Sequence, residues 1–160
     1  RASGRAEAGR MSPAGPSTIE LPPDLGALAL LAQFLEEFAE ANGIPPGPLL
    51  QLNLALDELV TNAITHGGSS EPLSLVLRLS GDRLQAELTD RGRRFDPLRE
   101  APPPDLDSPL EERRVGGLGI HMVKKMMDLV DYQWTGDRNR VRIEKRLDGP
   151  PAGDPPRSDG

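Results

Sequence analysis

Apolar residues recur at helical spacing through the middle of the chain, most clearly from Leu52 to Gly67, LNLALDELVTNAITHG. At about 3.6 residues per turn, the apolar side chains of this stretch fall on one stripe, which predicts a long helix packed against a core. The stripe consists of Leu49, Leu52, Leu56, Leu59, Val60 and Ala63. Glu58 and Asn62 lie one turn apart on a second face, so the helix presents a carboxylate and a carboxamide together. The alternative interpretation of this pair is a solvated helix face.

Patterns elsewhere predict a two-layer fold. Apolar residues alternate from Leu73 to Leu79 and from Leu84 to Leu88, and the turn signal Gly81-Asp82 between them predicts a β-hairpin. The other expected elements are a strand over Ser17 to Leu21, a helix from the cap Asp24 to about Asn42-Gly43, a helix after Gly119, and strands over Leu129 to Trp134 and Val141 to Leu147. Pro45, Pro46 and Pro48 are expected to separate the first two helices. This order favours an α/β (α+β) sandwich, in which helices cover one face of a mixed, mostly antiparallel sheet.

One domain over residues 17–147 is expected, because 160 residues are enough for one domain and a modest second element but not for two full domains. Residues 1–16 and 148–160 have no apolar period and are rich in small and polar residues, so both are predicted to be disordered tails. Between Arg91 and Arg114 no period holds either. A loop of this length is expected to be a functional lid or a disordered insert.

Composition excludes several classes of function. The formal net charge of −6 argues against a nucleic-acid binder, which needs clustered basic residues. The absence of cysteine excludes disulfides, thiolate metal sites and a cysteine nucleophile, and the two histidines are far apart in sequence. No apolar stretch is long enough for a membrane span and no signal-like segment is present. We therefore expect a cytoplasmic protein that binds neither nucleic acid nor membrane.

Two short basic runs leave two interpretations open. Arg91, Arg93 and Arg94 form one run, and Arg113 and Arg114 form the other. Each is either a solvated, charge-mixed loop or a set of contacts to a small anionic ligand.

Asp90 continues the inward phase of Leu84, Ala86 and Leu88, so its carboxylate is expected on the apolar side of the hairpin. An ionised group left unpaired there would cost on the order of several kcal/mol, so Asp90 needs a hydrogen-bond donor. The exocyclic amine of adenine is one such donor, and Gly92 would let a flat ring approach the backbone. The alternative is an aspartate that only caps a turn.

The glycine-rich stretch Gly116 to Gly119, GGLG, is expected to open a helix. Backbone N–H groups at a helix N-terminus can hold an anion such as a phosphate. The stretch has neither the Gly-Lys-Ser/Thr ending of a Walker A motif nor the glycine spacing of a dinucleotide-binding fingerprint. A flexible hinge with a helix cap is the alternative.

Together, the ordered motifs E-x-x-x-N, D-x-G-x-x-F-D-P and G-G-L-G-I resemble those of the ATPase superfamily of DNA gyrase and histidine kinases, whose Bergerat fold is an α/β sandwich. The stretches ALDELVTNAITHG and GGLGIHMVKKMMD look more specifically like bacterial anti-sigma-factor serine/threonine kinases of partner-switching systems. The resemblance covers about residues 17–147.

This resemblance implies a role for each motif residue. Asn62 would be the metal ligand, holding Mg²⁺ through its amide oxygen, and Glu58 would be the catalytic general base on a serine hydroxyl or on water. Asp90 would bind the adenine amine with Gly92 beside the ring. Gly117 and Gly119 would face the phosphates of ATP.

The function implied is an ATP- and Mg²⁺-dependent anti-sigma regulatory factor that acts as a serine/threonine kinase on a small antagonist protein and also binds a sigma factor. A homodimer is left open, and so is the identity of both partners. Relatives commonly carry an arginine on the first helix, whereas residues 27–32 carry no charge. The alternatives are a nucleotide-gated binding module without useful catalysis, or simple ATP hydrolysis.

Overall fold

A computed structural model describes residues 15–100 and 119–147. The strands are β1 (Ser17–Leu21), β2 (Leu73–Ser80), β3 (Arg83–Asp90), β4 (Leu129–Trp134) and β5 (Asn139–Arg146). The helices are α1 (Ala27–Asn42), α2 (Pro46–Asn62), the π-helix η1 (Ala63–Gly67), α3 (Pro97–Glu100) and α4 (Gly119–Met126). Apart from η1 and α3, the order of strands and helices is the one expected from the sequence pattern.

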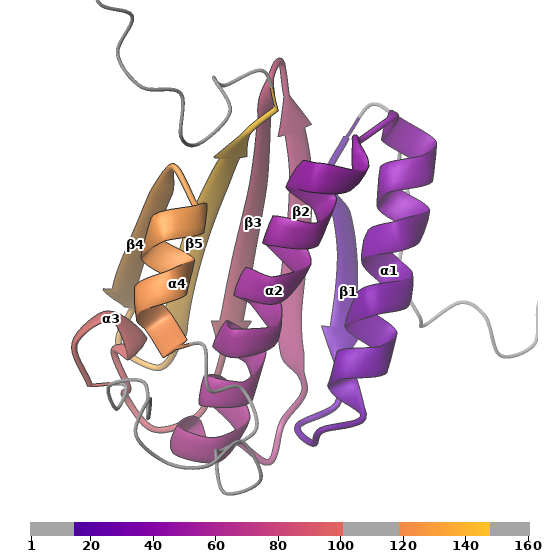
Figure 1. Ribbon diagram of the computed structural model, residues 1–160. Coiled ribbons are helices and arrows are strands. Elements are labelled where there is room, and N and C mark those ends of the chain that lie inside the picture. The colour runs from indigo at the N-terminus through magenta and orange to yellow at the C-terminus, as the bar shows by residue number, and fades with distance from the viewer. Residues whose placement is uncertain (1–14, 101–118, 148–160) are drawn as a thin grey trace, which may run out of the picture.

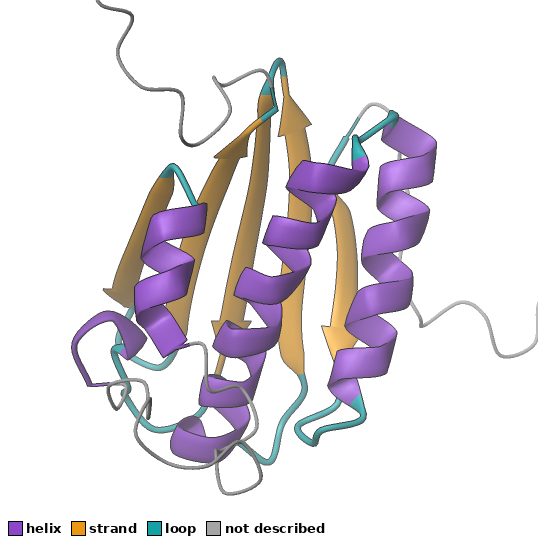
Figure 2. Ribbon diagram, viewed as in Figure 1, coloured by secondary structure: helices purple, strands orange, loops and turns teal. Residues whose placement is uncertain are grey.

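The strands form a five-stranded sheet in the order β1-β2-β3-β5-β4, and every neighbouring pair is antiparallel. The sheet is therefore antiparallel rather than mixed. Helices α1, α2 and α4 lie side by side over one face of it, with α2 in the middle (Figures 1 and 2). This arrangement confirms the expected two-layer sandwich.

The alternation of leucines places one face of the hairpin in the core. Leu75 is paired with Leu88 and Leu77 with Ala86, and all four side chains are buried. Residues in the opposite phase lie on the face that the helices leave uncovered, where Arg83 and Glu144 form a salt bridge of 3.1 Å across strands β3 and β5. Asp90 ends β3 in the buried phase and is 7% exposed.

The middle helix begins earlier than its prolines suggested. We expected Pro45, Pro46 and Pro48 to form a linker, but α2 starts at Pro46, so this expectation was wrong. Proline is accommodated in a first turn because the N–H groups there have no intrahelical acceptor. At its other end, the regular α-helix stops at Asn62 and the chain continues through η1 to Gly68, whose φ of 63° ends it. The pattern predicted one continuous helix here and did not distinguish the π-helical turn.

Two further boundaries differ from the pattern. Part of the stretch expected to lack regular structure forms the short helix α3, in which the backbone N–H of Leu98 donates to the Asp96 side chain at 2.9 Å. Strand β5 begins at Asn139 rather than Val141. The proposed lid beyond residue 100, with Arg113, Arg114 and Gly117, lies outside the described residues, as do the expected tails apart from residues 15 and 16. The domain boundaries at 16 and 147 stay predictions. Within the two described ranges, no helix combines the length and apolar character that crossing a membrane requires.

Candidate functional site

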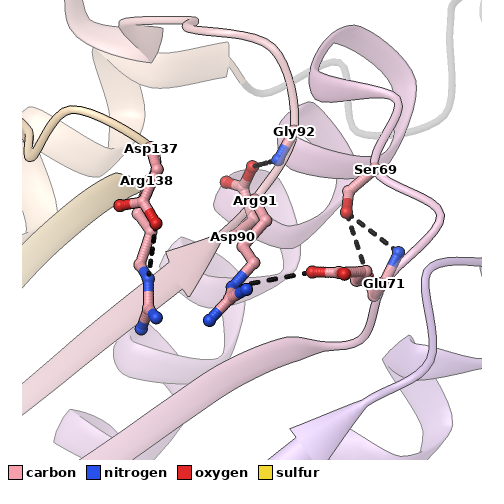
Figure 3. Close-up of polar contacts among 7 residues, drawn as sticks. All are labelled: Ser69, Glu71, Asp90, Arg91, Gly92, Asp137 and Arg138. Carbon is pink, nitrogen blue, oxygen red and sulfur yellow. Dashed lines mark hydrogen bonds and ion pairs between the residues drawn. The ribbon is translucent and has the colours of Figure 1, made fainter.

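Asp90 is a buried carboxylate at the end of the sheet nearest η1. Its Oδ1 accepts hydrogen bonds from the side-chain amide of Asn139 at 3.0 Å and from the backbone N–H of Gly92 at 2.9 Å. Burial raises the pKa of Asp90, and these two hydrogen bonds partly oppose that rise. Figure 3 shows the Gly92 contact at the end of β3. Because both bonds go to Oδ1, the described residues hold the carboxylate by that oxygen.

The loop after Asp90 is fastened to the end of η1. The backbone N–H of Arg93 donates to the Gly67 carbonyl at 2.9 Å, and the Arg93 guanidinium donates to the His66 carbonyl at 2.6 Å. A Cβ on Gly92 would lie 2.7 Å from the Gly67 oxygen, so only glycine fits between the two segments without displacing one of them. Gly92 thus lets the loop pack tightly against η1.

Asn62 reaches the same region from the end of α2. The residue is 6% exposed, and its amide nitrogen has no hydrogen-bond partner among the described residues. Asn62 and Asp90 line one small cavity of about 10 Å³, roughly the space of one water molecule. The other lining residues are Leu59, Ala63, Gly67, Leu88, Phe95, Pro97, Asn139 and Val141. A buried carboxylate and an unsatisfied buried amide therefore face the same space.

An aromatic pair, His66 and Phe95, lies beside the small cavity, which Phe95 lines. The rings of His66 and Phe95 are stacked, with centroids 4.8 Å apart and planes 17° from parallel. Phe95 also lines the cavity, and its backbone N–H donates to the Asn139 side-chain oxygen at 2.9 Å. The chain thus brings η1 and the loop after β3 together at the cavity.

Glu58 lies one helical turn before Asn62 on α2 and is half-buried. Burial raises its pKa, and it does the same for the neighbouring Asp57. Among the described residues, neither Glu58 nor Gly119 lines the small cavity. Gly119 is buried at the first position of α4, with a φ of 69°, and α4 packs against α2. Of the expected site residues, the cavity therefore brings together Asn62 and Asp90, with Gly92 beside them.

In the basic run of Arg91, Arg93 and Arg94, two of the side chains form an ion pair or a hydrogen bond with neighbouring protein groups. Arg91 forms an ion pair with Glu71 at 3.5 Å, and Arg93 is committed to the His66 carbonyl. Figure 3 shows the ion pair of Arg91 and Glu71. Both residues line a second, open cavity of about 520 Å³. This cavity is lined by residues 67–71 and 91–93 and by Asp137. The geometry favours the charge-mixed loop over an anion site for Arg91.

Asn139 was not singled out from the sequence, although it is 3% exposed and contacts Asp90 directly. A signal was present, because Asn139 shares the inward phase of Val141 and Ile143. Extending the alternation of that strand back by one step would have placed a second polar residue on the buried face, as it did for Asp90.

The donor set suits a magnesium ion held together with a nucleotide rather than by the protein alone. Within residues 15–100 and 119–147, no group of three or more acidic, histidine or cysteine side chains could form a metal cage. Mg²⁺ needs no such cage when phosphate oxygens and water supply most of its ligands. The side-chain oxygen of Asn62 is a hard ligand of the kind that could supply one protein contact to such an ion, whereas the amide nitrogen, the atom without a partner among the described residues, can only donate a hydrogen bond.

Most of the chain matches one family of known proteins. The profile of the family "Histidine kinase-like ATPase domain" matches residues 21–145. A Listeria monocytogenes protein named "Serine-protein kinase RsbW" is 26% identical over 117 residues, covering 69% of this chain and 74% of that protein. A protein of the same name from Halalkalibacterium halodurans is 26% identical over 151 residues, covering 84% and 91%. A Thermoanaerobacter protein named "Anti-sigma F factor" is 28% identical over 102 residues, covering 62% and 71%.

A solved structure gives an independent comparison of the fold. The crystal structure of the RsbU and RsbW domains of a Mycobacterium tuberculosis protein superposes with a TM-score of 0.62 at 19% identity. The match covers 86% of this chain and 34% of that one, so this chain spans about a third of the larger protein. At this identity the similarity shows a shared fold and nothing finer.

The packing around Gly92 predicts the effect of adding a single methyl group. Gly92→Ala should lower the free energy of unfolding by about 1–3 kcal/mol, because the new Cβ forces the loop away from the Gly67 carbonyl. Urea unfolding measures this change. Gly47→Ala is the matched control, since a Cβ there meets no atom within 4 Å, and it should leave stability unchanged or slightly raised. Equal stability of Gly92→Ala and the unchanged protein would contradict the described packing.

Proposed function

This chain belongs to the histidine kinase-like ATPase domain family, and from that premise we propose that it is an anti-sigma regulatory factor that phosphorylates an antagonist protein with Mg²⁺-ATP. ATP is the nucleotide that the family implies. The observation that carries the proposal is the shared cavity of Asp90 and Asn62, two buried polar groups contributed by different layers of the fold. The names of the similar proteins support serine as the acceptor residue and a sigma factor as a second partner.

Asp90 would recognise the base. An ionised carboxylate only accepts hydrogen bonds, and both of those it accepts from described residues go to Oδ1. Oδ2 would accept the exocyclic amine of adenine. A purine is much larger than the present cavity of about 10 Å³, so binding must move part of the lining. Phe95 lies in a loop, so its side chain would turn away from the cavity while its backbone N–H keeps the hydrogen bond to the Asn139 side chain.

Asn62 would contact the metal at the phosphate end of the nucleotide. When bound, Mg²⁺ would neutralise phosphate charge and help to orient the transferred group. Gly119, and Gly117 beyond the described residues, would approach the phosphates at the N-terminus of α4. In this arrangement α2 and α4 border the phosphates, while β3 and its loop border the base.

Glu58 would be the general base. It lies one turn from Asn62 on α2, so a hydroxyl held near the phosphates would come within reach of that flank of the helix. Burial raises the pKa of Glu58, which makes its carboxylate a stronger base than an exposed glutamate. Its proposed action is to accept the proton of the serine hydroxyl as that oxygen is phosphorylated.

A nucleotide-gated binding module is the rival proposal, and one similar protein named only as an anti-sigma factor favours it. Incubation with γ-labelled ATP and candidate antagonist proteins separates the two. Label on a serine of the antagonist supports the kinase. Nucleotide-dependent association without label supports the module, and release of phosphate alone supports hydrolysis.

Asp90→Asn should weaken ATP binding by roughly tenfold to a hundredfold, because the amide loses a charged acceptor for the adenine amine. Calorimetry in Mg²⁺ and in EDTA measures this loss, which should be the same in both. Asn62→Ala should weaken binding in Mg²⁺ only. Asp82→Asn makes the same chemical change at the opposite end of the β2–β3 hairpin and should bind as the unchanged protein does. An Asp90→Asn protein with full affinity would remove the adenine contact.

Glu58→Gln should bind ATP normally but lose at least about a hundredfold in phosphotransfer, because glutamine cannot accept the serine proton. The raised pKa sets the pH dependence. The base works when ionised, so the transfer rate should fall as pH drops through that raised pKa, at a higher pH than for an exposed glutamate. The adjacent Asp57→Asn, also partly buried, is the control and should retain transfer. Unchanged transfer by Glu58→Gln would exclude this role.

A further inference from the structure

Asn139 lies directly opposite Asp90 in the register of β3 and β5. It is the first residue of β5, shares the buried face with Val141 and Ile143, and is 3% exposed. An amide side chain at such a position is costly unless its hydrogen bonds are satisfied. It belongs to none of the sequence motifs described above.

The side-chain nitrogen and oxygen of Asn139 each make two hydrogen bonds. Its nitrogen donates to Asp90 Oδ1 at 3.0 Å and to the Arg93 carbonyl at 2.8 Å. Its oxygen accepts from the Phe95 backbone N–H at 2.9 Å and from the Tyr132 hydroxyl at 2.6 Å. An amide offers two donor hydrogens and two acceptor lone pairs, so this side chain has no capacity left for a ligand. It can act on a bound base only through the groups that it holds.

We propose that Asn139 is the positioning residue of the adenine site, a role that rests on the proposed nucleotide binding. Its nitrogen end engages Oδ1 of Asp90, which directs the other carboxylate oxygen to the base. Both ends together anchor the backbone of residues 93–95, which carries Phe95. The Asn139 side chain thereby links Asp90, which would bind the adenine amine, to Phe95, which lines the cavity beside it.

The chemistry explains why an amide is needed. An aspartate would keep the acceptor for Phe95 and Tyr132 but would set a second carboxylate against Asp90, and two close carboxylates do not ionise independently. Of the two hydrogen bonds that described residues donate to Asp90, an alanine would leave the one from Gly92. Because burial raises the pKa of Asp90 and the Asn139 bond lowers it, loss of that bond favours the protonated acid. A protonated Asp90 is a poorer acceptor for the adenine amine.

Other ionisable groups in this part of the protein also affect its charge. They must be the same in the unchanged protein and in every variant that is compared with it. They are His66 on η1, Tyr132 on β4, Glu58 on α2, Asp137 and Arg138 in the β4–β5 turn, and Arg91, Arg93, Arg94 and Asp96 in the loop after β3. None is altered in the variants below. A difference in pH dependence between proteins therefore reports on Asp90 and its partner.

The test is calorimetric binding of ADP with Mg²⁺ to the full chain over a range of pH. Asn139→Ala should weaken binding about tenfold, and its affinity should begin to fall at a higher pH than that of the unchanged protein as the pH is lowered, because the lost bond no longer lowers the pKa of Asp90. Asn139→Asp, which keeps size and the acceptor end, should weaken binding as well. Asn42→Ala removes a comparable amide that donates to the Phe38 carbonyl at the end of α1, and it should bind as the unchanged protein does.

The outcomes separate this role from nucleotide binding itself. If the unchanged protein binds ADP while Asn139→Asp binds equally well, or the pH profile of ADP binding by Asn139→Ala is not displaced to higher pH, the positioning role is wrong and the nucleotide site stands. If the unchanged protein does not bind ADP, both proposals fail. If Asn139→Ala folds poorly, Asn139→Asp still tests the proposal, because an aspartate oxygen can accept the same hydrogen bonds from Phe95 and Tyr132.

Discussion

The candidate site depends on one constraint, a carboxylate on the buried face of a β-sheet. Asp90 follows three apolar inward positions of β3 and is almost as buried as they are. Removing an ionised carboxylate from water is costly unless donors surround it. Two donors from described residues reach one of its oxygens, so the fold holds Asp90 in place and leaves part of its acceptor capacity for a ligand.

The surrounding structure supplies these donors by bringing distant segments together. The antiparallel pairing of β3 with β5 places Asn139 opposite Asp90, and the Gly92 turn folds the next loop back onto η1. Asn62 comes from the helical layer, at the junction where α2 becomes η1. A π-helical turn inside a helix is often found at functional sites, because it shifts the side chains that follow relative to the α-helical period. The small cavity thus lies where both layers of the sandwich meet.

Much of the fold was predictable because the period of apolar residues differs between helices and strands. Strand β1 and strand β4 have the expected bounds, and Asp90 was assigned to the buried face from alternation alone. Local signals failed where tertiary packing decides the outcome. The prolines at the start of α2 were interpreted as a linker, although a first helical turn accepts them. Asn139 was missed because its importance comes from pairing with Asp90, which is far away in the sequence. The roles of Glu58, Asn62 and Gly119 depend on a bound nucleotide and stay proposals.

The central claim is that the buried Asp90 selects adenine, and competition between purine nucleotides tests it most directly. Adenine presents an amine to the carboxylate, whereas guanine presents a carbonyl oxygen at the same ring position and would leave two acceptors facing each other. Calorimetric titration of the full chain with Mg²⁺-ATP and Mg²⁺-GTP should give at least about tenfold tighter binding of ATP. Equal affinity for the two nucleotides would contradict this account.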